Sequence, residues 1–230
     1  MLYLYCLSDE ATARVLDGAA GIGGVAPHLF DCAGICAVVS EFASATVAVT
    51  RENVLAHERV LSRVLAATTP LPFRFGTVAG EERLENFVST HRASLLSALA
   101  RVRGAVEMSV KIIWDEEPER AAPDSEAQEA GAGTRFLLTK RRELLGAERL
   151  QERAENLSAW LAHMLEENVK DSLVEVRPAA SLVVSASHLV AREAVESYRA
   201  RLEAARRERP DLRFLTSGPW PPYSFSNLFP

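Results

Sequence analysis

The chain has few cysteines and no long uncharged segment. Three cysteines, Cys6, Cys32 and Cys36, occur among 230 residues, and this odd, low number argues against a secreted disulfide framework. The uncharged segments are shorter than the about 20 residues that a helix needs to span a bilayer, and residues 178–191, for example, hold 14. The N-terminal sequence MLYLYCLSDE also lacks the basic start of a signal peptide. We therefore expect a soluble, cytoplasmic protein without a membrane span.

The common sequence motifs of catalysis and cofactor binding are absent as well. We find no HExxH or GxSxG motif and no phosphate-binding Walker loop, and GIGG at 21–24 lacks the spacing of a dinucleotide turn. Cys32 and Cys36 lie near His28, but the spacing is not that of a zinc knuckle, and no second Cys/His pair follows. We expect both cysteines to be small core residues. The sequence thus predicts no catalytic residues, no metal site and no cofactor.

Charge is distributed unevenly along the chain. The net charge is −5, and residues 115–129 (DEEPERAAPDSEAQE) hold seven acids and one arginine, a local charge of −6. The other 215 residues therefore sum to +1, which gives no reason to expect nucleic acid as a partner. Residues 115–133 lack core-forming side chains and are interpreted as an acidic linker or surface loop, with an acidic docking element as the alternative.

The first half of the chain alternates between predicted strands and helices. Residues 2–7 are aromatic and aliphatic and predict a buried strand, and residues 27–40 predict two short strands broken near Gly34. Apolar residues recur at helical spacing in 51–67 and 81–103. Residues 105–114 alternate between apolar and polar side chains, which predicts a half-buried strand with its polar residues, Glu107 among them, facing solvent.

The second half predicts a helix, two strands, a helix and a strand. If strand 105–114 precedes them, the order is βαββαβ, the split βαβ or ferredoxin-like arrangement. The alternative is that strand 105–114 closes the N-terminal sheet. The predicted elements are helix 134–169, strands 173–177 and 182–187, helix 190–207 and strand 212–216.

The predicted fold class is therefore α+β with two domains. Residues 1–114 form the N-terminal α+β domain, and residues 115–133 form the acidic linker. Residues 134–230 form the C-terminal ferredoxin-like domain, which ends in a docked tail rich in proline and aromatic residues.

One non-periodic segment is PLPFRFGTV at residues 70–78. Two prolines favour an extended approach, and Phe73 and Phe75 are expected to share a face, with Arg74 between them. A structural arginine that locks the loop is the favoured interpretation, and a contact with a partner or ligand is the alternative. Phe73, Arg74 and Phe75 are thus candidates for structural or partner-contact roles.

A second non-periodic segment is SGPWPPYSF at residues 217–225. Its three prolines predict a stiff, polyproline-like segment, and Trp220, Tyr223 and Phe225 are large apolar anchors. We expect Trp220 to be buried against the body of the protein, because so apolar a chain end is usually tied down. The alternative is a free ligand for a proline-binding domain.

The two segments together resemble the gas vesicle protein F/L family (GvpF/GvpL). The resemblance rests on LPFRFGTV at 71–78 and GPWPPYSF at 218–225, in that order, and it covers nearly the whole chain except the acidic linker. Shorter similarities are YLYCL at 3–7, VVSEF at 38–42, VKIIWD at 110–115 and VVSASHLV at 183–190. The residues do not distinguish the F type from the L type.

The resemblance implies a non-enzymatic role in building gas vesicles. Members of the family are accessory or minor structural components with an α+β N-terminal and a ferredoxin-like C-terminal domain. The resemblance also implies partners, namely the small hydrophobic shell protein (GvpA type) and other gas vesicle accessory proteins, and a cytoplasmic location associated with the vesicles. The alternative function is a small-molecule-binding enzyme with a pocket between two α+β domains.

Overall fold

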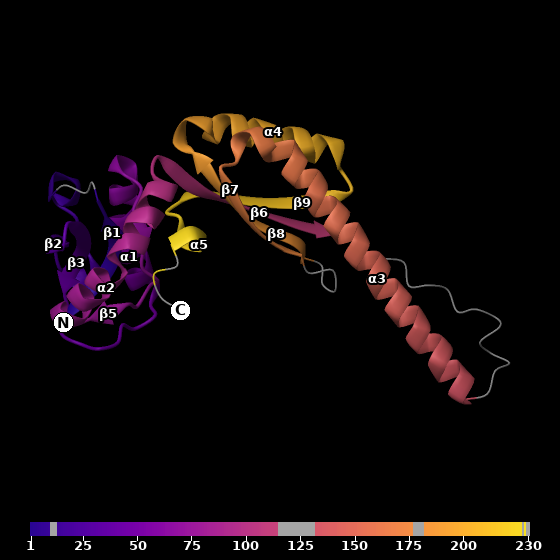
Figure 1. Cartoon of the computed structure of the whole chain (residues 1–230), viewed down its shortest axis with the longest axis horizontal. Coiled ribbons are helices and arrows are strands. Elements are labelled where there is room, and N and C mark those ends of the chain that lie inside the picture. The colour runs from indigo at the N-terminus through magenta and orange to yellow at the C-terminus, as the bar shows by residue number, and fades with distance from the viewer. Residues whose placement is uncertain (10–12, 115–131, 177–181, 227, 229–230) are drawn as a thin grey trace. The chain divides into compact units, whose positions relative to one another are not determined.

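The computed structural model shows a chain that forms two compact units (Figure 1). The structure describes residues 1–9, 13–114, 132–176, 182–226 and 228. Unit 1 comprises Met1–Met108, Leu189–Arg192 and Gly218–Pro230, and unit 2 comprises Ser109–His188 and Glu193–Ser217. The fold class is α+β, as predicted.

The predicted acidic linker, residues 115–133, lies outside the described residues except for its last two positions, which begin a helix. The predicted domain limits at residues 114 and 134 stay a prediction. By its contacts, the tail from Gly218 onward is part of unit 1.

Unit 1 is built on a five-stranded antiparallel sheet. Its strands lie in the order β2-β3-β1-β4, and β5 also pairs with β1. The predicted break near Gly34 is a hairpin turn in which Ala33 and Gly34 have positive φ angles of 51° and 83°. The strands are β1 (Leu2–Ser8), β2 (His28–Cys32), β3 (Ile35–Glu41), β4 (Leu71–Pro72) and β5 (Val78–Ala79).

Every residue of β1 is buried, because a helix covers each face of the sheet. Helix α1 (Arg51–Ala67) packs on the face that carries Tyr3, and α2 (Glu81–Val102) packs on the face that carries Leu4. The pairing register shifts between Leu4 and Cys6, and this bulge adds one residue to the face that packs on α1.

Local signals account for the two long helices of unit 1. The Asn53 amide donates to Thr50 Oγ1 at 3.2 Å, so Thr50 caps the first turn of α1. Glu81 and Glu82 lie in the first turn of α2, where the helix dipole favours negative charge. The ranges predicted for these helices, 51–67 and 81–103, agree with the structure to within one residue.

Most of the second sheet belongs to unit 2, and its strands lie in the order β7-β8-β6-β9. Each long helix connects two strands that are separated in the sheet by one other strand, which is the predicted ferredoxin-like arrangement. The alternative, in which residues 105–114 join the N-terminal sheet, is wrong. The elements are β6 (Ala105–Trp114), α3 (Ala132–Leu165), β7 (Asp171–Val176), β8 (Leu182–Ala191), α4 (Val195–Glu208) and β9 (Leu212–Trp220).

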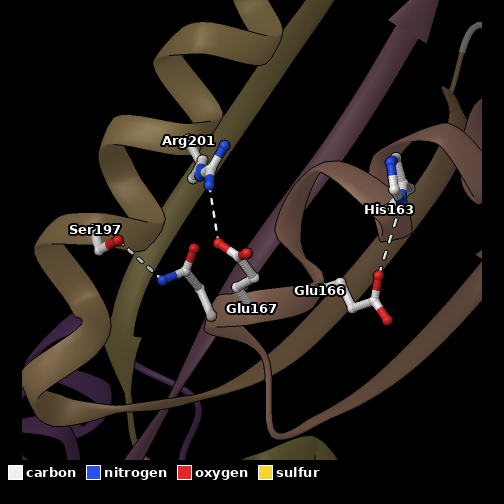
Figure 2. A network of polar contacts seen from close by, with 6 residues as sticks. His163, Glu166, Glu167, Ser197 and Arg201 are labelled. Carbon is white, nitrogen blue, oxygen red and sulfur yellow. Dashed lines mark hydrogen bonds and ion pairs between the residues drawn. The ribbon is translucent and has the colours of Figure 1, made fainter.

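Polar contacts tie the end of α3 to α4, which lies beside it (Figures 1 and 2). Arg201 Nη2 donates to Glu167 Oε2 at 2.9 Å, and Asn168 Nδ2 donates to Ser197 Oγ at 3.0 Å. The Arg201–Glu167 pair is exposed, so it contributes less than about 1 kcal/mol. Their structural effect is to orient the short 3₁₀ helix Glu166–Asn168, which leads into β7.

Several predicted element limits are wrong, among them the end of helix 134–169, which lies at Leu165. The helix predicted from residue 190 begins at Val195, because β8 continues to Ala191. The last strand continues to Trp220, so the predicted polyproline-like segment is a strand in its first part and then a short helix, α5 (Tyr223–Ser226). Pro219 is tolerated there because β9 is an edge strand, where a missing N–H need not break the sheet.

Candidate functional site

The two non-periodic segments of the sequence come together in unit 1. The first supplies β4, β5 and the turn between them, and the second supplies α5, which contacts β4. Phe75 and Tyr223, one from each segment, pack against the buried cluster that contains Tyr3. The site is therefore assembled from both ends of the chain around β1.

A chain of hydrogen bonds, here called the tyrosine–histidine chain, consists of Tyr3, His57, Tyr223 and Glu58. Tyr223 Oη donates to Glu58 Oε1 at 2.9 Å and lies 3.2 Å from His57 Nε2. Tyr3 Oη lies 2.8 Å from His57 Nδ1. Since the Tyr223 hydroxyl donates to Glu58, its oxygen accepts from Nε2–H, and Nδ1 is left to accept from Tyr3. The tyrosine–histidine chain links α5 to α1 and β1 and places a tyrosine hydroxyl against each ring nitrogen of His57.

Burial determines the ionisation of the tyrosine–histidine chain. Burial lowers the pKa of His57 to about 4, although the Phe73 carbonyl partly opposes this effect. Burial raises the pKa of Tyr3, and burial together with the negative charge of Glu58 raises that of Tyr223. At neutral pH the imidazole and both phenols are therefore uncharged, and the arrangement is suited to positioning α5, not to proton transfer.

Glu107 holds the other side of the tail. Its Oε2 accepts from the Ser224 amide at 2.8 Å, and its Oε1 accepts from Ser224 Oγ at 2.6 Å. The residue is 7% exposed, so the expectation that it faces solvent is wrong. A buried carboxylate needs such charge-assisted hydrogen bonds, and Ser224 supplies two of them.

Gly218 allows the tail to approach β6 this closely. Its φ is +117°, and a Cβ at this position would lie 2.7 Å from the Glu107 carbonyl oxygen and 2.9 Å from Met108 Sδ. Only glycine avoids both the strained backbone and the clash. This close approach explains why the segment GPWPPYSF begins with glycine.

Residues Phe73, Arg74 and Phe75 are placed differently from one another. Phe73 is fully buried in the cluster that packs against α2, whereas Phe75 is half-buried and packs against the cluster beneath α1. The expectation that they share a face is wrong, because the backbone turns after Arg74, whose carbonyl accepts from Thr77 N at 3.2 Å. The Arg74 side chain is exposed, so it does not lock the loop by burial.

The tail is anchored by Phe225, not by Trp220. Trp220 is 44% exposed, so the expectation of a buried tryptophan is wrong. It is the last residue of β9, and the buried residues of the tail follow it, from Pro221 and Pro222 into α5. Phe225 is 2% exposed and lies in the cluster that packs against α2, and the Arg101 guanidinium lies 5.5 Å from the centre of its ring.

A mostly apolar cavity of about 470 Å³, here called the unit 1 cavity, lies beside β5 and the start of α2. Residues 76–78 of the first segment and the adjoining Ala79 form one wall, and Arg83 is the charged group among the described residues that line it. The lining residues are Leu4, Ala45, Gly76, Thr77, Val78, Ala79, Arg83, Leu84 and Phe87. Such a surface suits an apolar side chain of another molecule.

Within the described residues, no three His, Cys, Asp or Glu side chains are grouped as a metal ion requires. Cys32 is buried at the end of β2, and Cys36 is half-buried on β3 opposite Asp31. Burial raises the pKa of the Cys32 thiol to about 11, so the thiol is protonated at neutral pH. None of the helices formed by the described residues combines the length and the apolar character needed to cross a membrane.

Comparison with known proteins identifies the class to which this fold and site belong. The family model "Gas vesicle synthesis protein GvpL/GvpF" matches residues 1–227. Because the match extends over nearly the whole sequence, the chain belongs to this family, and the resemblance noted in its two non-periodic segments is confirmed. Membership of the family supports a role in gas vesicle formation.

Individual relatives agree with the family match. The chain is 29% identical to gas vesicle protein L2 of Halobacterium salinarum, over 97% of this chain and 90% of the relative. It is also 29% identical to gas vesicle protein F of Haloferax mediterranei, over 99% of this chain and 93% of the relative. These two identities are equal, so they do not favour the L type over the F type.

Solved structures share the fold. The crystal structure of GvpF from Anabaena sp. PCC7120 is similar with a TM-score of 0.78 and 22% identity, over 98% of this chain and 95% of that chain. GvpF from Microcystis aeruginosa is similar with a TM-score of 0.78 and 21% identity, over 98% of each chain.

Proposed function

We propose that this protein is an accessory or minor structural protein of gas vesicle assembly. In this role it binds the small hydrophobic shell protein (GvpA type) and other accessory proteins, in the cytoplasm and in association with the vesicles. The observation that carries the proposal is the family match over residues 1–227. The named relatives are gas vesicle proteins of the L and F types.

The unit 1 cavity is our candidate for the contact with the shell protein. Its wall is formed partly by LPFRFGTV, and its lining is mostly apolar, as an apolar shell subunit requires. Burial of apolar surface contributes about 25 cal/mol per Å², so one inserted aliphatic side chain contributes about 2 kcal/mol. Arg83 at the wall is placed to pair with a carboxylate on the partner.

The tyrosine–histidine chain does not favour the alternative of a small-molecule enzyme. Its histidine is satisfied on both ring nitrogens by side chains of the protein, so it offers no proton acceptor to a substrate. We assign the tyrosine–histidine chain the role of holding the C-terminal tail in place.

The proposal is tested by filling the unit 1 cavity in the full-length protein. Ala45 is exposed and lines the cavity, so Ala45→Trp places a ring in it without disturbing the core. Ala43→Trp, two positions away on the same exposed segment and outside the lining, is the matched control. We expect Ala45→Trp to weaken capture of co-expressed shell protein at least about tenfold, which corresponds to about 1.4 kcal/mol. Equal capture by both variants would contradict this location, and no capture by the parent protein would contradict the proposed function.

A further inference from the structure

A cavity of about 350 Å³, here called the unit 2 cavity, is lined by residues of α3, β7, β8 and the turn before β7. Its buried lining residues are Leu161 and Leu165 of α3 and His188 of β8. Val174 of β7 also lines it and is 43% exposed. The inner wall of the unit 2 cavity is therefore apolar except for one imidazole.

Three charged residues line the outer part of the unit 2 cavity. Glu166 and Lys170 are exposed, and Asp171 is half-buried. Both carboxylates also have contacts within the protein, since Glu166 Oε2 lies 3.7 Å from His163 Nδ1 (Figure 2) and Asp171 Oδ1 accepts from the Ser172 amide. Two carboxylates beside one ammonium group disfavour a further anion in the cavity.

The hydrogen bond between Tyr198 and His188 fixes the proton of the imidazole. Tyr198 is fully buried, and its Oη lies 2.7 Å from His188 Nδ1, its hydrogen-bond partner among the described residues. The hydroxyl therefore donates to Nδ1, because a buried O–H without an acceptor is strongly unfavourable. Burial lowers the pKa of His188 to about 4, so the ring is neutral at neutral pH and carries its one N–H at Nε2.

The Nε2–H group of His188 is a donor that faces the unit 2 cavity. None of the described residues accepts a hydrogen bond from it. In the described part of the chain, Asn168 Oδ1 is the one side-chain oxygen or nitrogen that is both fully enclosed and without a partner. Nε2 is therefore reached from the cavity that its ring lines. A donor among apolar side chains favours an occupant that brings an acceptor.

The chemistry of the lining selects an uncharged occupant with an apolar body and a terminal oxygen. A carboxylate or phosphate would lie near Glu166 and Asp171, and an ammonium or guanidinium would place N–H donors against the Nε2 donor. Among protein side chains, tyrosine combines an aromatic ring with a neutral terminal oxygen. Buried tyrosine hydroxyls usually find a hydrogen-bond partner, and Nε2–H would supply it here.

We propose that the unit 2 cavity receives the side chain of an exposed tyrosine of a partner protein. Its ring packs against Leu161, Leu165 and Val174, and its hydroxyl oxygen accepts from His188 Nε2. A protein segment that carries the tyrosine would also cover the exposed part of Val174, which a free phenol would not. Tyrosine is among the residues that most often dominate the energy of an interface. This surface is distinct from the unit 1 cavity, and the proposal does not rest on the shell protein being the partner.

The first test titrates the full-length protein with the capped peptide Gly-Ala-Tyr-Ala-Gly and follows the imidazole nitrogen resonances of His188. We expect saturable binding that shifts the Nε2 resonance. The same peptide with Phe in place of Tyr should bind about fivefold more weakly, because it lacks the acceptor. The peptide with phosphotyrosine should bind more weakly still, because its charge lies near two carboxylates. No binding of the tyrosine peptide, or equal binding of either of the other two, overturns the proposal.

A free phenol is the other source of the same chemistry. We expect p-cresol, which has the ring and the hydroxyl but no peptide groups, to bind more weakly than the tyrosine peptide, since it leaves the outer part of the cavity uncovered. Equal or tighter binding of p-cresol would assign the cavity to a small molecule and would overturn the proposal of a partner protein.

Two tryptophan variants of β7 locate the site. Val174→Trp places an indole ring at the cavity, and we expect it to weaken binding of the tyrosine peptide at least about tenfold. Leu173→Trp is the matched control, because Leu173 is the preceding residue, is similarly exposed at 47% and points to the opposite face of the strand. We expect this control to bind the peptide like the parent protein, and equal effects of the two variants overturn the proposal.

A double variant tests the donor. His188→Phe combined with Tyr198→Phe replaces both hydrogen-bonding partners by apolar groups of similar shape and leaves neither of them unpaired. A thermal melt checks that this variant folds. We expect it to bind the tyrosine and phenylalanine peptides equally, since the Nε2–H donor is gone. A parent-like preference for the tyrosine peptide would show that another group binds the hydroxyl and would overturn the proposal.

Discussion

Strands β1 and β7 show how differently two strands of one chain are used. All seven residues of β1 are buried between α1 and α2, whereas the four central residues of β7 are exposed. The cause is position in the sheet, since β1 lies inside its sheet with a helix on each face and β7 lies at an edge. An apolar residue in β1 therefore stabilises the fold, and one at the centre of β7 stays exposed.

Alanine substitutions at one leucine in each strand should give the largest difference in the free energy of unfolding. Leu7→Ala removes a fully buried side chain from β1, and we expect the free energy of unfolding to fall by about 3 kcal/mol. Leu173→Ala in β7 should lower it by less than about 0.5 kcal/mol. Urea unfolding of both variants measures the difference. Similar losses at both positions would mean that β7 is a core strand and would contradict the comparison.

Lowering the pH should reduce the free energy of unfolding because two histidines are buried in the neutral form. The pKa values of His57 and His188 are lowered to about 4, so the unfolded chain takes up their protons near pH 6.5 and the folded protein does not. Their stabilising contribution is present above about pH 6.5 and is lost as the pH falls toward 4, at most about 3 kcal/mol for each histidine. Urea unfolding between pH 7 and pH 4.5 measures this loss.

Single substitutions test which histidine causes the pH dependence of stability. His57→Gln lowers stability at every pH, but it should make the dependence between pH 6.5 and 4.5 shallower, since glutamine does not titrate in this range. His163→Gln changes a side chain that is 84% exposed and should leave the dependence unchanged. A parent-like dependence in His57→Gln would show that its imidazole is not buried in the neutral form.

The smallest effect is expected at the end of β9. Trp220 is 44% exposed, so Trp220→Ala should lower the free energy of unfolding by only about 1 kcal/mol. Phe225→Ala, in the same tail but at a 2% exposed position, should cost clearly more. Thermal melts of the two variants without any partner make the comparison. A larger loss for Trp220→Ala would reverse our assignment of the anchor.

Local sequence predicted the secondary structure well where local forces decide it. The range 51–67 is that of α1, because its apolar periodicity and the Thr50 cap are contained within a few residues. The order of the elements that follow residue 134 was also predictable from the order of periodic segments, although the sequence left open which sheet residues 105–114 join. The end of the chain was not, since an edge position lets a strand continue through Pro219.

The candidate site was only partly predictable. The two non-periodic segments were recognised, and Phe75 and Tyr223 pack against the same cluster. His57 was missed because a single histidine on an amphipathic helix belongs to no recognisable motif. Glu107 was expected to face solvent because the alternation of side chains along a strand places it on the polar face. Trp220 was expected to be the buried anchor, which is Phe225, and Arg74 was expected to lock its loop but has an exposed side chain.

The amino-acid sequence by itself determined the α+β class, the four long helices and most strands of the described chain, and the family, because these depend on local periodicity and on two distinctive segments. Only the tertiary structure decided which polar groups are buried. Glu107 meets Ser224 across 117 positions, and His57 meets Tyr223 across 166. Whether such a group is stabilised or penalised depends on partners that local patterns do not contain, because the cost of burying a polar group is removed only by the hydrogen bonds that it finds in the folded chain.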